Sequence, residues 1–224
     1  YDVRHYDLTI DYKPGSNQLI GRTVLDAVAL TDLNEFTLDL HGLMVSKVNV
    51  DAVPVSRFWT RHGKLHVRTD EAIEEGELFR VTIRYGGRPK AIPDGDDAMG
   101  WEELTDGVIV AGQTNGAPSW FPCHDRPANK ASYRIAITTP TDYHVVANGS
   151  LVSRHRGAST TTWVYEQDEP MATYLATVQV GRYVSRAVPG SVVPITAVLP
   201  QHLLERYDLA FGRQPEIMDF FVRC

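Results

Sequence analysis

The sequence predicts an all-β fold, a β-sandwich or a set of open curved sheets, with a short helical segment near its C-terminal end. Three observations lead to this prediction. Apolar and polar residues alternate in many short runs, which is typical of half-buried strands. Turn-forming residues separate these runs at regular spacing. A helix-compatible pattern occurs only after residue 200. No internal repeat or low-complexity segment interrupts the pattern.

The clearest alternation is at the start of the chain, where Tyr6, Leu8, Ile10 and Tyr12 are separated by polar residues. A turn is expected at 14–17. Further strands are expected at 19–30, 36–40, 48–50, 53–55, 65–67, 79–85, 108–110, 133–137, 145–146, 151–152, 160–165 and 174–180. We expect hairpins at Asp51-Ala52 and at Asn148-Gly149. Residues 88–106, which are rich in acids, proline and glycine, are expected to form a loop.

The pattern changes near Val188-Pro189-Gly190. One more strand is expected at 193–199. Residues 201–224 are compatible with a helix, either in two pieces or with Pro215 in the first turn of a second helix. Their apolar clusters need a surface to pack against. We therefore expect a β-rich domain over 1–189 and, over 190–224, the start of a second domain that continues beyond this chain.

Composition excludes several classes of protein. The formal net charge of −6 disfavours a nucleic-acid partner, because phosphate binding needs a basic face. The sequence contains no run of 18 apolar residues, so no membrane-spanning helix is predicted. The first residues lack the features of a signal peptide. The two cysteines, Cys123 and Cys224, are too few for a disulfide framework, which favours a reducing compartment. We expect the protein to be cytoplasmic.

Catalytic motifs are scarce. The sequence has no H-E-x-x-H motif. His62 and His66 have helical spacing but lie in a β context, where that spacing does not bring two side chains to one metal. Consecutive residues of an extended chain point in alternate directions, so Cys123-His124-Asp125 is interpreted as a structural corner rather than a catalytic triad.

Gln113 is the candidate binding residue. It follows the strand at 108–110 and enters a turn-rich stretch, 111–127, that also contains aromatic residues. Its amide provides both a hydrogen-bond donor and an acceptor. Binding groups are commonly carried by loops that a rigid sheet positions.

The segment Trp-Phe-Pro-Cys-His-Asp-Arg-Pro at 120–127, followed by Lys130 and Tyr133, resembles the "FPCxDEPxxKAxF" signature of zinc aminopeptidases of the aminopeptidase N and leukotriene-hydrolase type. Four further segments resemble that family in the same order: Tyr6-Asp7-Leu8, the turn at 146–149 and the segments 170–176 and 181–183. Arg126 departs from the family's usual glutamate. The resemblance covers nearly the whole chain.

The resemblance implies a saddle-like, multi-sheet β-sandwich N-terminal domain that precedes a thermolysin-like catalytic domain. In this family zinc is bound in the catalytic domain, so no catalytic or metal-binding residue is expected in this chain. The resemblance also implies that Gln113, ten positions before Cys123, holds the free α-amine or the first carbonyl of a peptide substrate and is followed by a cis peptide bond to Thr114. The expected partners are the substrate's N-terminus and the protein's own catalytic domain.

Two alternatives remain open at this point. A non-catalytic interaction scaffold could share the same architecture without zinc ligands. A carbohydrate-binding β-sandwich is suggested by Trp59, Trp101 and Trp120, because exposed indole rings stack on sugars.

Overall fold

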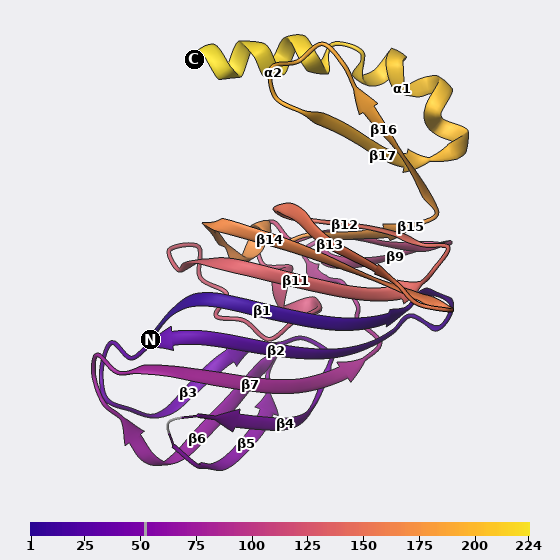
Figure 1. Cartoon of the computed structure of the whole chain (residues 1–224). Helices are drawn as coiled ribbons and strands as arrows, with labels where there is room; N and C mark the ends of the chain where they lie inside the picture. Colours follow the sequence, from indigo (N-terminus) through magenta and orange to yellow (C-terminus); the bar gives the residue numbers. More distant parts are fainter. Residues whose placement is uncertain (52) are drawn as a thin grey trace.

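The structure is a computed structural model that describes residues 1–51 and 53–224. Fifteen strands form the main body, and a small C-terminal unit follows it (Figure 1). The body strands are β1 (Asp2–Lys13), β2 (Gln18–Val28), β3 (Leu33–Asp39), β4 (Met44–Val50), β5 (Val55–Arg61), β6 (Lys64–Ile73), β7 (Leu78–Gly87), β8 (Ile92–Asp94), β9 (Asp97–Leu104), β10 (Gly107–Ala111), β11 (Lys130–Pro140), β12 (His144–Ala147), β13 (Ser150–Arg156), β14 (Thr160–Ala172) and β15 (Val178–Gly181). Short 3-10 turns lie at Pro14–Ser16, Ala117–Ser119 and Thr173–Leu175.

Three sheets make up the body. The largest has the strand order β13-β14-β11-β1-β2-β7-β4, the second β12-β15-β10-β9-β8, and the third β3-β6-β5. All neighbouring strands are antiparallel except β1 and β11, which pair in parallel from His5↔Ser132 to Asp11↔Thr138. The seven-stranded sheet extends along the whole body, with the five-stranded sheet beside its β13-β14-β11 end and the three-stranded sheet beside its β7-β4 end (Figure 1). This arrangement confirms the predicted all-β, multi-sheet fold.

The core is continuous through the body. The alternating apolar residues of β1 are almost fully buried, with Tyr6, Leu8, Ile10 and Tyr12 each no more than 1% exposed. They belong to one cluster that includes residues from all three sheets. Burial of this many apolar side chains is the main source of the fold's stability.

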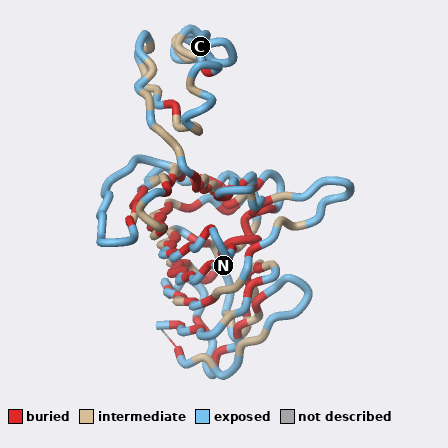
Figure 2. The backbone as a smooth tube through the Cα atoms, turned by 90° about the vertical axis from the view of Figure 1, so that its right-hand side faces the viewer, coloured by how far each residue is buried: buried red, intermediate tan, exposed pale blue. Residues whose placement is uncertain are grey.

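The C-terminal unit consists of a two-stranded hairpin, β16 (Tyr183–Val188) and β17 (Ile195–Pro200), a 3-10 turn (Gln201–Leu203) and two helices, α1 (Leu204–Phe211) and α2 (Gln214–Arg223). It stands off from the body and is joined to it by the segment between β15 and β16 (Figures 1 and 2). The predicted division at residue 189 falls between the paired strands β16 and β17.

Pro215 lies in the first turn of α2, as one of the two sequence-based alternatives predicted. The guanidinium of Arg186 on β16 pairs with Asp208 of α1 and lies 4.5 Å from the centre of the Tyr207 ring, which ties the hairpin to the helix. Most of the helical residues are exposed, as Figure 2 shows. In the described part of the chain no helix has the length and apolarity needed to cross a membrane.

Two predicted hairpins are wrong. The strands on either side of residues 51–52 belong to different sheets, because β4 pairs with β7 and β5 pairs with β6. Ala52 itself lies outside the described residues. Asn148-Gly149 does form a tight turn, but it passes the chain from β12 in the five-stranded sheet to β13 in the seven-stranded sheet. A local turn signal fixes the reversal of the chain and not the partner of each strand.

The acidic segment 88–106 was predicted to be a loop, and this prediction is wrong. The segment contains β8 and β9. The second part of β9 pairs with β10, from Leu104↔Gly107 to Gly100↔Ala111, and its first residues pair with β8. Trp101 is buried, whereas the neighbouring Glu102 and Glu103 are exposed. Acidic composition does not prevent a strand here, because Trp101 faces the core and β10 provides the hydrogen-bonding partner for β9.

Candidate functional site

The loop after β10 presents Gln113 to solvent. Gln113, Thr114 and Asn115 are exposed, and the glycines on either side of them, Gly112 and Gly116, are buried. The chain therefore leaves the sheet, exposes three side chains and returns. The peptide bond between Gln113 and Thr114 is cis, as predicted.

Glycine packing fixes the base of this loop. The Gly116 N–H donates to the Gly112 carbonyl at 2.7 Å. A Cβ atom on Gly112 would lie 2.7 Å from the backbone oxygen of Tyr174, and one on Gly116 would lie 2.5 Å from the backbone nitrogen of Gly100. Because these contacts are with backbone, no side chain fits at either position. The loop thus stands on a close-packed base formed by β9 and by the 3-10 turn at Thr173–Leu175.

A hydroxyl completes this base. The Ser119 hydroxyl is fully buried, donates to the Gly116 carbonyl at 2.6 Å and accepts from the backbone N–H of Trp101 at 3.0 Å. The two bonds connect the far end of the loop to β9. A buried hydroxyl with both donor and acceptor roles satisfied holds its neighbours in one arrangement.

The corner that follows, at residues 120–127, joins the loop to the three-stranded sheet. Cys123 exchanges two backbone hydrogen bonds with Asp39 at the end of β3, of 2.7 and 3.0 Å. The His41 N–H donates to the Pro118 carbonyl at 2.8 Å. Phe121 is fully buried and packs edge-on against Tyr6 of β1. These contacts agree with the interpretation of this segment as a structural corner.

The three side chains of Cys123-His124-Asp125 point to different partners. Burial raises the pKa of the Cys123 thiol well above its ordinary value, so the thiol stays neutral and is a poor nucleophile. His124 Nδ1 lies 2.9 Å from Asn129 Oδ1, and the Thr173 hydroxyl donates to the Asp125 carboxylate. The residues therefore hold the corner together and do not form a catalytic triad.

His124 makes the stability of the corner sensitive to acid. Burial, as the main cause, lowers the pKa of His124 below its usual 6.5. A histidine with a lowered folded-state pKa contributes stability above the unfolded value, and that stability is lost as the pH falls through the folded value. We expect His124→Gln to lose less stability than the wild type between neutral pH and a pH below about 6.5.

Urea unfolding at the two pH values measures this difference. His155→Gln, on the exposed strand β13, is the control and should retain the full wild-type pH dependence. Burial also lowers the pKa of His144, so part of the acid sensitivity should remain in the His124→Gln variant. Equal pH dependence of the wild type and His124→Gln would refute the assignment.

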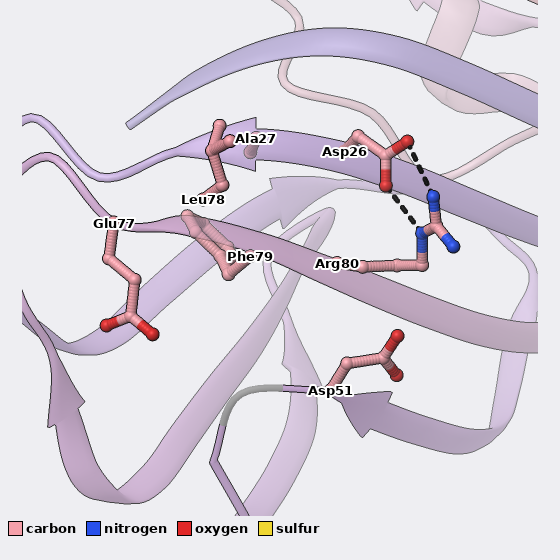
Figure 3. A pocket seen from close by; sticks show the side chains of 7 residues that line it. All are labelled: Asp26, Ala27, Asp51, Glu77, Leu78, Phe79 and Arg80. Atoms are coloured by element: carbon pink, nitrogen blue, oxygen red, sulfur yellow. Dashed lines mark hydrogen bonds and ion pairs between the residues drawn. The ribbon is translucent and has the colours of Figure 1, made fainter.

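The surface depression drawn in Figure 3 is distant in sequence from this loop. It has a volume of about 590 Å³ and is lined by Asp26, Ala27, Asp51, Glu77, Leu78, Phe79 and Arg80. Its single cation, Arg80, is held by Asp26 through bonds of 2.6 and 3.0 Å. Because this guanidinium is already engaged by a carboxylate, the depression offers no ready site for an anion.

The domain that carries this loop matches a known protein family. The model of the Peptidase M1 N-terminal domain matches residues 3–175, which include β2 to β14, all of β1 except Asp2, and the whole Gln113 loop. The chain belongs to this family. The M1 N-terminal domain thus accounts for most of the body that surrounds the site.

Solved structures and curated proteins agree with this assignment. An M1 zinc metallopeptidase from Deinococcus radiodurans is 26% identical with a TM-score of 0.79, over 89% of this chain and 48% of that chain. A mutant of it bound to a Tyr-Ser-Ala substrate has a TM-score of 0.81 at the same identity, over 89% of this chain and 49% of that one. Human glutamyl aminopeptidase is 28% identical over 64% of this chain and 14% of its own length.

A further relative is leucine aminopeptidase 2 of Phaeosphaeria nodorum, which is 26% identical over 81% of this chain and 31% of its own length. The tricorn protease-interacting factor F2 of Thermoplasma acidophilum is 29% identical over 82% of this chain and 22% of its own length. The chain thus spans about half the length of these solved structures and less than a third of these curated relatives.

The zinc that the M1 family implies does not fit the residues of this domain. Across residues 1–51 and 53–224 no group of three or more His, Cys, Asp and Glu side chains is placed to hold a metal ion. His62 is in the β5–β6 turn, whereas the ring of His66 stacks on Trp59 with centroids 4.9 Å apart. No metal-dependent step is therefore assigned to this chain.

The tryptophans that suggested sugar binding are mostly inaccessible. Trp101 is 2% exposed and Trp120 is fully buried. Trp59 is partly exposed, but His66 already stacks on its ring. Two of the three rings therefore cannot reach a sugar, which removes the main support for a carbohydrate-binding domain.

Two contributors to the site were not identified from the sequence. Gly100 lies in the segment that was expected to be a loop, and its positive φ of 97° and close approach to Ser119 and Gly116 place it under the Gln113 loop. The backbone of Tyr174 limits the other side. A glycine inside a strand next to a tryptophan is the only signal of this packing in the sequence.

Proposed function

We propose that this M1 N-terminal domain is part of a zinc aminopeptidase, in which it recognises the free amino terminus of a peptide substrate. The family assignment supports the proposal, as do relatives named as aminopeptidases and zinc metallopeptidases. Hydrolysis itself is assigned to a catalytic domain, so this chain alone is proposed to be inactive.

The observation that carries the proposal is the exposed Gln113 on a loop whose base is locked by buried glycines. The amide oxygen of Gln113 accepts a hydrogen bond from the substrate's ammonium group, and the rigid base fixes where that group is held. A site built around such a contact disfavours an internal peptide segment, which has no free ammonium to offer.

The C-terminal unit is proposed to contact the catalytic domain. Its helices expose large apolar side chains, including Leu209 at 89%, Phe220 at 57% and Phe221 at 65%. Residues of this kind are usually covered by another surface. We propose that the zinc ligands lie in that catalytic domain and that zinc there activates the attacking water.

A non-catalytic scaffold is the alternative proposal, and an intact or missing H-E-x-x-H motif in the parent protein distinguishes the two. We also propose a cytoplasmic location, which the two free cysteines support. Imaging of the tagged parent protein in cells tests the location, and exclusion from the cytoplasm would contradict it.

An assay of the parent protein tests the proposed activity. It should cleave an aminoacyl-anilide, lose this activity with a zinc chelator and regain it with added zinc. The N-acetylated form of the same substrate should be cleaved poorly, because it lacks the ammonium group. The isolated chain with added zinc should be inactive, and robust turnover by it would contradict the proposal.

A further inference from the structure

The three-stranded sheet carries a concentration of positive charge that the proposed aminopeptidase function does not use. Residues 55–68, which form β5, a two-residue turn and part of β6, include four Lys and Arg residues and no Asp or Glu. The whole chain has 28 acids and a formal net charge of −6. A basic segment of this length in an acidic chain marks a surface suited to a negatively charged partner.

The basic side chains lie together on the outward side of the sheet. The inward residues of β6, Leu65 and Val67, are buried in the core. Alternation along each strand then places Arg57, Trp59 and Arg61 of β5, with Lys64, His66 and Arg68 of β6, on the opposite side. We call Arg57, Arg61, Lys64 and Arg68, together with the free edge of β5, the basic edge.

In the part of the chain that the structure describes, two of the four cations lack a carboxylate partner. Arg68 is held by Glu35 through bonds of 2.7 and 3.1 Å, and Lys64 pairs with Asp39. Within the described residues, neither Arg57 nor Arg61 is in an ion pair. Both are exposed. The basic edge thus has two guanidinium groups that remain available to carboxylates.

The backbone of β5 is available as well. Strand β5 is the last strand of its sheet and pairs only with β6 among the described strands. Every second residue of an edge strand directs its N–H and C=O away from the sheet, where an extended peptide can pair with them. The sheet also lies at the end of the body opposite the C-terminal unit, so that unit leaves it uncovered (Figure 1).

The ring of Trp59 argues for a polypeptide partner rather than a nucleic acid. His66 stacks on it with an interplanar angle of 6°, and the guanidinium carbons of Arg57 and Arg68 lie 5.3 and 5.7 Å from its centre. A nucleic-acid base could stack on this ring only by displacing the groups that already lie against it. The ring instead fixes the orientation of the arginines beside the open edge.

We propose that the basic edge binds an extended, acidic segment of a partner protein, which adds to the three-stranded sheet beside β5. The partner's backbone pairs with the free N–H and C=O groups of β5. Its Asp and Glu side chains, on alternate residues, meet Arg57 and Arg61. Charge on an edge strand also protects it from unspecific pairing, so the decisive property is selective binding of an acidic strand.

Fluorescence anisotropy with a fluorescein-labelled peptide of alternating Glu and Thr residues tests the proposal. The chain should bind this peptide and should bind neither the Lys-Thr equivalent nor an acidic peptide of alternating Glu and Pro, because proline lacks the N–H that pairing needs. Arg57→Glu/Arg61→Glu should weaken binding about tenfold or more, and binding should weaken as salt is raised.

The matched control is Arg22→Glu/Arg84→Glu. These arginines are cross-strand neighbours on β2 and β7, are exposed, and give the same change in net charge. This variant should bind within about twofold of the wild type, and thermal melting should confirm that both variants are folded. The proposal is overturned by absence of binding, by equal binding of the Glu-Pro peptide, by equal loss in both variants, or by binding only to single-stranded DNA or phosphatidylserine vesicles.

Discussion

Gly116→Ala is expected to lower the free energy of unfolding by about 3 kcal/mol, the upper part of the range for overpacking a close-packed interior. The added Cβ would lie 2.5 Å from the backbone nitrogen of Gly100, 2.7 Å from its Cα and 2.8 Å from the Cα of Gly112. None of these atoms can rotate away. Either β9 or the Gln113 loop must therefore move, and the Ser119 hydrogen bonds that connect them are strained as well.

Urea unfolding of the purified chain measures this effect, with Gly15→Ala as the matched control. A Cβ at Gly15 meets no atom within 4 Å, and its φ lies outside the positive range, so this substitution should change the unfolding free energy by less than about 0.5 kcal/mol. If Gly116→Ala is as stable as Gly15→Ala, the base of the loop is not close-packed and the rigid positioning of Gln113 is wrong.

Local patterns in the sequence predicted the strands well where one side is buried. The alternation of β1 is an example, because each apolar residue from Tyr6 to Tyr12 faces the core. Strand pairing could not be predicted in the same way. The parallel pair of β1 and β11 joins His5 to Ser132, and no local signal specifies a contact across that separation.

The candidate site shows the same division. That Gln113 would lie on a loop at the end of a strand follows from its glycine neighbours and the turn-rich stretch after it. The rigidity of this loop depends on Gly100 and Tyr174. Strand β9 places Gly100 against Gly116, and the 3-10 turn at Thr173–Leu175 places the backbone of Tyr174 against Gly112. Only the three-dimensional packing of the sheets shows that Gly112 and Gly116 have no room for a Cβ atom.

The close-packed base and the exposed glutamine have different roles, and substitutions can separate them. A change in the base is expected to alter stability and to displace the loop. A change of the Gln113 side chain should leave the fold intact, because this side chain is exposed and is not part of the buried core. A loss of activity in a fully stable variant would therefore report on substrate binding alone.

In the parent enzyme, Gln113→Ala is expected to lower kcat/KM for substrates with a free amino terminus by about tenfold to a hundredfold. This corresponds to the loss of one hydrogen bond to a charged group, about 1.5–3 kcal/mol. Asn115→Ala, in the same loop and also exposed, is the control and should retain wild-type kinetics. The two variants should have the same melting temperature as the wild type.

Gln113→Glu provides the opposite test. A carboxylate in place of the amide adds a charge that attracts the substrate's ammonium, so discrimination between a free and an N-acetylated substrate should increase. A glutamine that acts only as a spacer would give equal losses for both substrates in Gln113→Ala and no gain in Gln113→Glu. The ratio of kcat/KM for the two substrates therefore separates recognition of the amine from a general disturbance of the active site, since a displaced catalytic group would lower both values together.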